Sequence, residues 1–160
     1  MLLRLLVAHD MAKVQQKSEK ITAFGGIFFV LDRFTPENIS KLAPNEVFVF
    51  GSNLFGHHGG GAARVALNRF GAIWGQGVGL QGQSYGIPTM QGGVETIVPY
   101  VEEFIDFAAD HPEMTFLVTR IGCGIAGFRD EEIAPLFKEA LEAENIVLPK
   151  SFVTLLLSKC

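Results

Sequence analysis

Two glycine-rich segments contain the residues of this chain that could bind or transform a ligand. The first, Gly51 to Gly61, includes Asn53 and His57 and ends in three consecutive glycines just before a helical pattern. Glycine lets a backbone approach another surface closely, and a helix start presents free N–H groups with a partial positive charge. Both properties favour an anion, most often phosphate. We therefore expect a phosphate and ribose cradle here, with a mobile loop that binds nothing as the alternative.

Polar side chains within the first segment could add chemistry to anion binding. The Asn53 amide could bond a sugar hydroxyl or position a water, or it could satisfy its own backbone as turn residues do. His57 or His58 could act as a general base or contact phosphate, although loop histidines are often inert. No third side chain with metal-ligand spacing accompanies them. We therefore expect no metal site and no cofactor.

The second glycine-rich segment, Gly122 to Gly127, follows another apolar run and has the same two interpretations. Cys123 lies within it, but a nucleophilic cysteine needs a base and a lowered pKa, and the sequence identifies no such partner. We expect Cys123 to be a small filling residue. Phe128, directly after the segment, could stack on a base or ribose or could fill the core. Polar side chains at 75–85 could read the edges of a ligand or could simply be hydrated. They are Gln76, Gln81, Gln83, Ser84 and Tyr85.

Strands and helices alternate along the chain and would position both segments. Apolar runs bounded by glycine, proline or polar residues predict strands at 26–31, 47–50, 84–87, 115–121 and 152–157. Helical periodicity and start signals predict helices at 61–70, 96–109 and 130–144, and a short helical turn at 35–38. Gly71 stands where a C-terminal glycine cap would. The alternation predicts an α/β fold with a mostly parallel sheet and helices on both faces.

Length and composition limit the classes of protein that the chain could be. Its 160 residues fit one domain, residues 24–160, preceded by an extension at 1–23 that could be a helix and linker. Hydrophobic residues make 48% and charged residues 19%, which favours a compact soluble core over disorder. A net charge of −4 without a basic patch argues against nucleic-acid binding. With two cysteines and no apolar span of about 20 residues, we expect a cytoplasmic protein that does not enter a membrane.

From about Arg33 to Ser158 the chain resembles the macro domain superfamily of ADP-ribose-binding modules, and more narrowly a small bacterial macro-like family. Four segments carry the resemblance: 45–53 (NEVFVFGSN), 59–63 (GGGAA), 82–89 (GQSYGIPT) and 121–128 (IGCGIAGF). The resemblance implies a three-layer α/β/α sandwich of macro type with a mixed central sheet. It also implies that ADP-ribose, or a related NAD-derived nucleotide diphosphate, binds in a cleft formed by the two glycine-rich loops.

Site residues follow from the same resemblance, position by position. Asn53 would reach the distal ribose, and the two loops would hold the diphosphate. The implied ligand-binding residues are Gly51, Ser52, Asn53, Gly59, Gly60, Gly61, Gly122, Cys123, Gly124, Ile125, Ala126, Gly127 and Phe128. If the protein hydrolyses an ADP-ribosyl or phosphoryl ester, Asn53 and His57 are the catalytic candidates. The aspartate that holds adenine in macro domains has no close counterpart, because Asp32 lies further from Asn53 than its usual spacing.

Two other function classes fit the same residues. A pure binding or sensing module would hold the ligand without turnover. A non-catalytic structural or partner-binding protein would have a vestigial cleft, with residues 1–23 mediating assembly. The sequence predicts neither the oligomeric state nor whether the protein is an enzyme.

Overall fold

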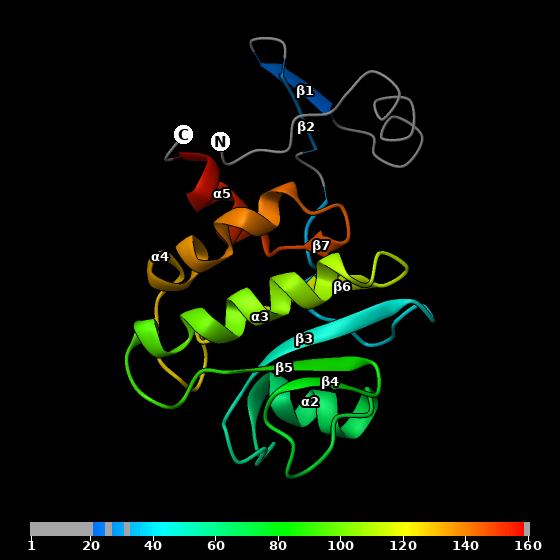
Figure 1. Ribbon diagram of the computed structural model, residues 1–160, viewed down its shortest axis with the longest axis vertical. Coiled ribbons are helices and arrows are strands. Elements are labelled where there is room, and N and C mark those ends of the chain that lie inside the picture. The colour runs from blue at the N-terminus through cyan, green and yellow to red at the C-terminus, as the bar shows by residue number, and fades with distance from the viewer. Residues whose placement is uncertain (1–20, 25–26, 31–32, 159–160) are drawn as a thin grey trace.

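The computed structural model describes residues 21–24, 27–30 and 33–158 and shows an α/β fold built on a five-stranded mixed sheet (Figure 1). The strand order is β4-β5-β3-β6-β7, in which β5, β3, β6 and β7 are parallel and β4 is antiparallel to β5. These strands are β3 (Glu46–Ser52), β4 (Gly79–Gln81), β5 (Ser84–Pro88), β6 (Thr115–Val118) and β7 (Ile146–Val147). Two further strands, β1 (Ile21–Phe24) and β2 (Ile27–Val30), pair antiparallel with each other.

The central strand β3 contains the apolar run that predicted it, and that prediction is confirmed. All four residues of the run, Val47 to Phe50, are buried. Val47 and Val49 belong to one hydrophobic cluster, whereas Phe48 and Phe50 belong to a second cluster on the other face of the sheet. The run is apolar without interruption because both faces of the strand are covered.

Helices cover both faces of the sheet, with more helices on one face than on the other. Figure 1 shows α2 and α3 on opposite sides of the strands. On one face, α2 (Gly61–Arg69) packs its buried Ala63 and Ala66 against Phe48 and Phe50. The other face is covered by α3 (Val98–Ala109), α4 (Asp130–Ile133), the 3-10 helix η2 (Ala134–Glu142) and α5 (Lys150–Ser158). A short 3-10 turn, η1 (Val94–Thr96), precedes α3. The predicted helices at 61–70 and 96–109 are therefore present, and Gly71 follows α2 with the positive φ of 76° that favours glycine.

The predicted helical turn at 35–38 is wrong. Thr35 donates its backbone N–H to the Leu148 carbonyl at 2.9 Å and its hydroxyl to the Val147 carbonyl at 3.0 Å. The side chain expected to cap a helix therefore bonds the end of β7 instead. These two hydrogen bonds tie the segment to the end of β7, and residues 35–38 form no helical turn.

The predicted strand at 152–157 is also wrong, because these residues form α5. The Pro149 carbonyl accepts hydrogen bonds from the N–H groups of Phe152 and Val153, at 3.0 and 3.1 Å, and so starts a helix. Phe152, Val153 and Leu156 are buried while Thr154 is exposed, which is a helical spacing and not a strand alternation. The last strand is the short β7, which the sequence did not predict.

Two further predicted elements are present but differ in length from the observed ones. The single helix expected at 130–144 is divided into α4 and η2, because Pro135 cannot donate a backbone hydrogen bond and Phe137 has the non-helical angles φ −100° and ψ 15°. The strand expected at 115–121 ends at Val118. The boundary expected between residues 23 and 24 lies within β1, and it stays a prediction. Residues 1–20 and Asp32 lie outside the described residues.

The helical assignment of α5 makes a testable distinction between Phe152 and Thr154. We expect Phe152→Ala to lower the free energy of unfolding by about 3 to 5 kcal/mol, because it empties a fully buried site. We expect Thr154→Ala to change it by less than about 0.5 kcal/mol, because Thr154 is exposed. Urea denaturation of both variants measures this. In a strand the two side chains would share one face, so comparable losses would contradict the helix.

Candidate functional site

A cleft of about 290 Å³ lies where the three parallel strands β3, β5 and β6 end. Its lining comes from the residues that follow these strands and from the start of α2. The lining residues are Gly51, Ser52, Asn53, His57, Gly59, Gly60, Gly61, Ala62, Ala63, Thr89, Met90, Thr119, Arg120, Ile121, Gly122, Gly124, Ile125 and Ala126. The carboxyl edge of a parallel sheet is the usual ligand position in α/β folds. The expectation that both glycine-rich segments meet at one cleft thus agrees with their placement.

The two glycine loops face each other across this cleft. A methyl group added to Gly60 would lie 3.0 Å from Cδ1 of Ile125, so the Ile125 side chain stands directly opposite the triple glycine. Methyl groups added to Gly59 or Gly124 would meet no atom within 4 Å. The cleft is therefore narrow between Gly60 and Ile125 and open beside Gly59 and Gly124, where a ligand can reach the backbone.

Asn53 and His57 are linked through the backbone of the first loop. The Asn53 amide nitrogen donates to the His57 carbonyl at 2.9 Å, and its amide oxygen accepts the His57 N–H at 2.9 Å. Asn53 therefore does what a turn residue does, although it also lines the cleft. Each of its two polar atoms keeps one unused bonding position, because an amide has two N–H donors and two lone pairs.

The His57 ring contacts aromatic side chains instead of a carboxylate. It stacks on Trp74 with a centroid distance of 5.1 Å and an interplanar angle of 11°, and it lies 5.8 Å from the Phe55 ring. A general base is usually oriented by a hydrogen-bonding partner. The catalytic roles of His57 and Asn53 stay predictions.

His58 is part of the core below the loop. It is 1% exposed, its ring edge meets the Phe50 ring, and its Nε2 lies 3.2 Å from the side-chain oxygen of Gln81. That oxygen also accepts the backbone N–H of Ile73 at 2.8 Å, so it is an acceptor and His58 Nε2 must donate. His58 therefore positions the loop and does not line the cleft.

The polar side chains at 75–85 also support the backbone, and none of them lines the cleft. Gln76 donates to the carbonyls of Val78 and Leu80, and Gln83 donates to those of Ala43 and Glu46. Ser84 donates to the Phe70 carbonyl, and Tyr85 is buried in the core. Gln76, Gln83 and Ser84 therefore bond carbonyl groups of the loops and strands around them and do not face the cleft.

Three residues expected in the second loop do not line the cleft, namely Cys123, Gly127 and Phe128. Cys123 and Phe128 are partly buried and pack against the larger core cluster. The loop closes on itself where the Phe128 N–H donates to the Gly122 carbonyl at 2.8 Å. Phe128 therefore fills the core, and the residues of the loop that line the cleft are Gly122 and Gly124 to Ala126.

Arg120 is the most informative lining residue that the sequence interpretation missed. It is the only charged side chain among the residues that line the cleft. Its guanidinium donates twice to one Asp130 carboxylate oxygen, at 2.9 and 3.1 Å, while staying largely exposed. The available signal was its place directly after an apolar strand, beside Thr119. The same reasoning would have found Thr89 and Met90, which follow β5.

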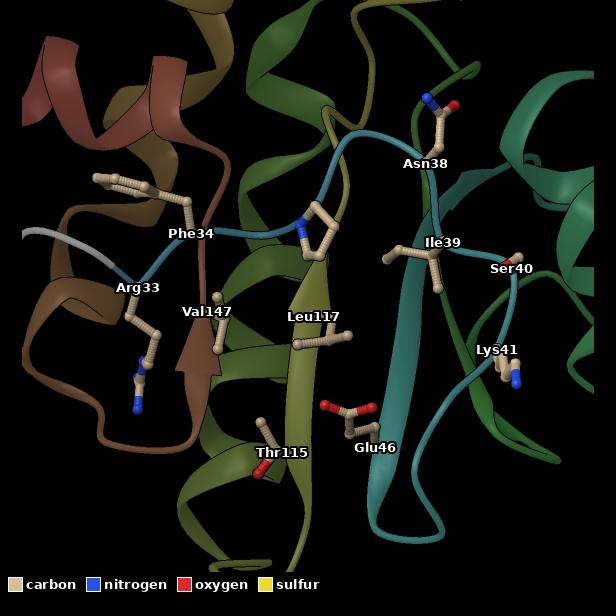
Figure 2. A pocket seen from close by; sticks show the side chains of 11 residues that line it. Arg33, Phe34, Asn38, Ile39, Ser40, Lys41, Glu46, Thr115, Leu117 and Val147 are labelled. Carbon is tan, nitrogen blue, oxygen red and sulfur yellow. The ribbon is translucent and has the colours of Figure 1, made fainter. Parts of the chain in front are cut away.

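A second and larger cavity, of about 420 Å³, lies elsewhere on the sheet. Figure 2 shows residues 36–41 passing in front of β3 and β6, with Leu117 and Val147 projecting from β6 and β7. It reaches Glu46 and Thr115, the first residues of β3 and β6, so it extends to the amino end of these strands. Its lining combines apolar side chains, uncharged polar side chains and charged side chains of both signs. We favour the smaller cleft as the functional site because it lies at the carboxyl ends of the parallel strands.

Comparison with known proteins finds no match for this chain among family models, curated proteins or solved structures. No described helix has the length and apolar character needed to cross a membrane. Within residues 21–24, 27–30 and 33–158, no three His, Cys, Asp or Glu side chains are grouped as a bound metal ion would require.

The surroundings of Cys123 predict that its thiol reacts slowly with thiol reagents. Burial, and then a hydrogen bond with Asp130, raises the pKa of the Cys123 thiol from 9.0 to about 12. At pH 8 this lowers the thiolate fraction by roughly a thousandfold relative to an ordinary cysteine. In a Cys160→Ser background, we expect a thiol reagent to modify native Cys123 at least about a hundredfold more slowly than the same chain unfolded in urea. Equal rates would restore Cys123 as a candidate nucleophile.

Proposed function

We propose that this protein binds ADP-ribose or a related nucleotide diphosphate in the cleft between the two glycine loops. One observation carries the proposal. The cleft is lined by backbone of both loops, by the start of α2 and by one cation, Arg120, with no carboxylate among its lining residues. This is the composition of an anion site, because anions are bound by backbone N–H groups and guanidinium groups.

The start of α2 supplies the strongest support for a phosphate. Gly60 occupies the cap position and has no side chain that could bond the first N–H groups of the helix. The first turn contains no acidic residue, and Ala62 and Ala63 line the cleft. The first N–H groups of a helix have no partner within the helix. They are therefore available to an anion that enters between Gly59 and Gly124.

A macro-type three-layer sandwich is part of the same proposal. The supporting features are the mixed sheet, the helices on both faces, and the order of Asn53 and a triple glycine after the central strand. In that arrangement the remaining N–H of Asn53 would bond the distal ribose. We propose binding in preference to hydrolysis, because the His57 ring is packed among aromatic rings and no carboxylate lines the cleft beside it.

Ligand-induced stabilisation tests the proposal directly. ADP-ribose at one hundred times its dissociation constant should stabilise the protein by about 2.7 kcal/mol, a rise of several degrees in Tm, whereas AMP should have a smaller effect. Gly124→Val should remove the ADP-ribose effect, because its side chain would stand in open cleft without displacing any atom of the fold. The Tm of the ligand-free variant should be close to that of the native protein. An undiminished shift in Gly124→Val would exclude this loop from the site.

Replacement of the cleft cation gives an independent test. We expect Arg120→Gln to weaken ADP-ribose binding about tenfold, because one charge-assisted contact with the diphosphate is lost. Arg129→Gln is the matched control, since Arg129 is an exposed arginine nine residues along the chain that does not line the cleft. Isothermal titration calorimetry at two salt concentrations should show a weaker salt dependence only for the Arg120 variant. Equal effects of the two variants on affinity would contradict the assignment of Arg120 to the ligand site.

A partner-binding role is the second candidate, and a specific observation favours it. Among the residues that the structure describes, six large apolar side chains are exposed: Leu54, Phe55, Ile73, Trp74, Met90 and Ile125. Met90 and Ile125 line the cleft, and the other four come from the two loops joined by the contact between His57 and Trp74. Exposed apolar groups gathered around one feature often mark a binding surface. A well-folded protein that no nucleotide stabilises would support this candidate.

A further inference from the structure

An aromatic surface borders the glycine cleft and is built from Phe55, His57 and Trp74. We infer that this surface stacks against a planar nitrogen-containing ring carried by the ligand whose diphosphate the cleft holds. The inference rests on the proposed function and assigns a second part of the ligand to a second set of residues. Phe128, the aromatic residue directly after the second glycine-rich segment, does not take this role, because it packs against the core.

The surface is continuous with the cleft through His57, which lines the cleft and also stacks on Trp74. The two rings are nearly parallel, with an interplanar angle of 11°. Trp74 is nevertheless 57% exposed and Phe55 is 76% exposed. Aromatic surface is thus exposed to solvent beside the cleft, although Trp74 stacks on His57.

The aromatic residues are held by a rigid contact between two loops. The Gly75 N–H donates to the Gly56 carbonyl at 2.9 Å, and the Ser52 hydroxyl donates to the Gly77 carbonyl. A methyl group on Gly77 would overlap the Asn53 carbonyl oxygen, and one on Gly56 would overlap the backbone of Gln76. The loops therefore pack backbone against backbone. An exposed tryptophan on such a support loses little conformational freedom when a ligand binds.

The cleft is small for a nucleotide ligand, which favours contacts of the ligand with the adjoining surface. At about 290 Å³ the cleft is at the lower limit of the ~300–1,000 Å³ found for small-molecule sites. Its lining contains glycine, alanine, small polar and aliphatic side chains, with His57 as the only aromatic ring. The adjoining surface adds the aromatic rings of Phe55 and Trp74, which the cleft lining lacks. Aromatic side chains are common stacking partners of bases, because every base has a flat π-face.

The ring could belong to either end of a nucleotide diphosphate, because adenine and nicotinamide share the flat π-face that tryptophan recognises. Three probes distinguish these sources: ADP-ribose has adenine only, nicotinamide mononucleotide has nicotinamide only, and NAD has both. Inorganic pyrophosphate serves as a probe without a ring.

Trp74 is the only tryptophan of the chain, so its fluorescence reports on this surface alone. We expect at least one of the three nucleotides to quench the fluorescence with the same dissociation constant that thermal shift gives, and pyrophosphate to leave it unchanged. Quenching by ADP-ribose would identify adenine as the ring. Quenching by NAD and the mononucleotide, without ADP-ribose, would identify nicotinamide.

Variants at Trp74 complete the test. We expect Trp74→Leu to weaken the binding of the nucleotide that quenches Trp74 fluorescence about tenfold. The same variant should leave pyrophosphate binding unchanged. Trp74→Phe should restore most of the affinity, because it keeps a flat ring. Ile73→Ala, a change at the neighbouring exposed side chain, should alter affinity by less than twofold.

Two outcomes separate failure of the stacking inference from failure of the proposed function. If a nucleotide stabilises the protein but does not quench Trp74, and Trp74→Leu keeps full affinity, the stacking inference is overturned and the proposed function stands. Absence of any nucleotide-induced stabilisation would remove the proposed function, and the stacking inference with it.

Discussion

The backbone contact at Gly77 is the constraint on which the site depends. The carbonyl groups of Asn53 and Leu54 lie so close to Gly77 that no side chain fits at this position. Gly86 has the same restriction, because a methyl group there would lie 2.6 Å from the Gly77 carbonyl oxygen. The loop after β3, the loop at 73–77 and the strand β5 are thus stacked backbone upon backbone. Their glycines are needed for packing, and this packing fixes where Asn53 and His57 stand.

The sheet supplies the second constraint, since it brings distant segments to one edge. β3 pairs in parallel with both β5 and β6, so the residues that follow all three strands lie side by side. Gly51 stands between them, and a methyl group on it would lie 3.3 Å from the Gly122 nitrogen and 3.3 Å from the Thr89 hydroxyl. Side chains at this edge would fill the cleft. The small residues there leave the backbone open to a ligand.

The sequence predicted those features whose signal is local. A continuous apolar run identified β3, and helical spacing identified α2 and α3, because burial on two faces or on one stripe leaves a direct trace in residue type. The strand expected at 152–157 failed because its apolar residues fit both periods, and the contact of Pro149 with the following N–H groups selected the helix. Arg120 was missed because its place in the cleft comes from the pairing of β6 with β3, which no short motif records.

The polar side chains of the first loop are largely engaged with their own backbone, and this decides how a ligand can be recognised. One donor and one acceptor of Asn53 bond His57, and Ser52 bonds Gly77. A substitution at Asn53 would therefore change the loop shape together with any ligand contact, so a loss of affinity there would have two causes. Besides the remaining N–H of Asn53, the groups available to a ligand are the N–H groups at the start of α2, the remaining donors of the Arg120 guanidinium and the aromatic surface at Trp74. Of these, the backbone groups and the cation recognise charge only. If the cleft binds a nucleotide, selectivity for its ring must come from groups other than these, and the exposed aromatic side chains beside His57 are suited to that role.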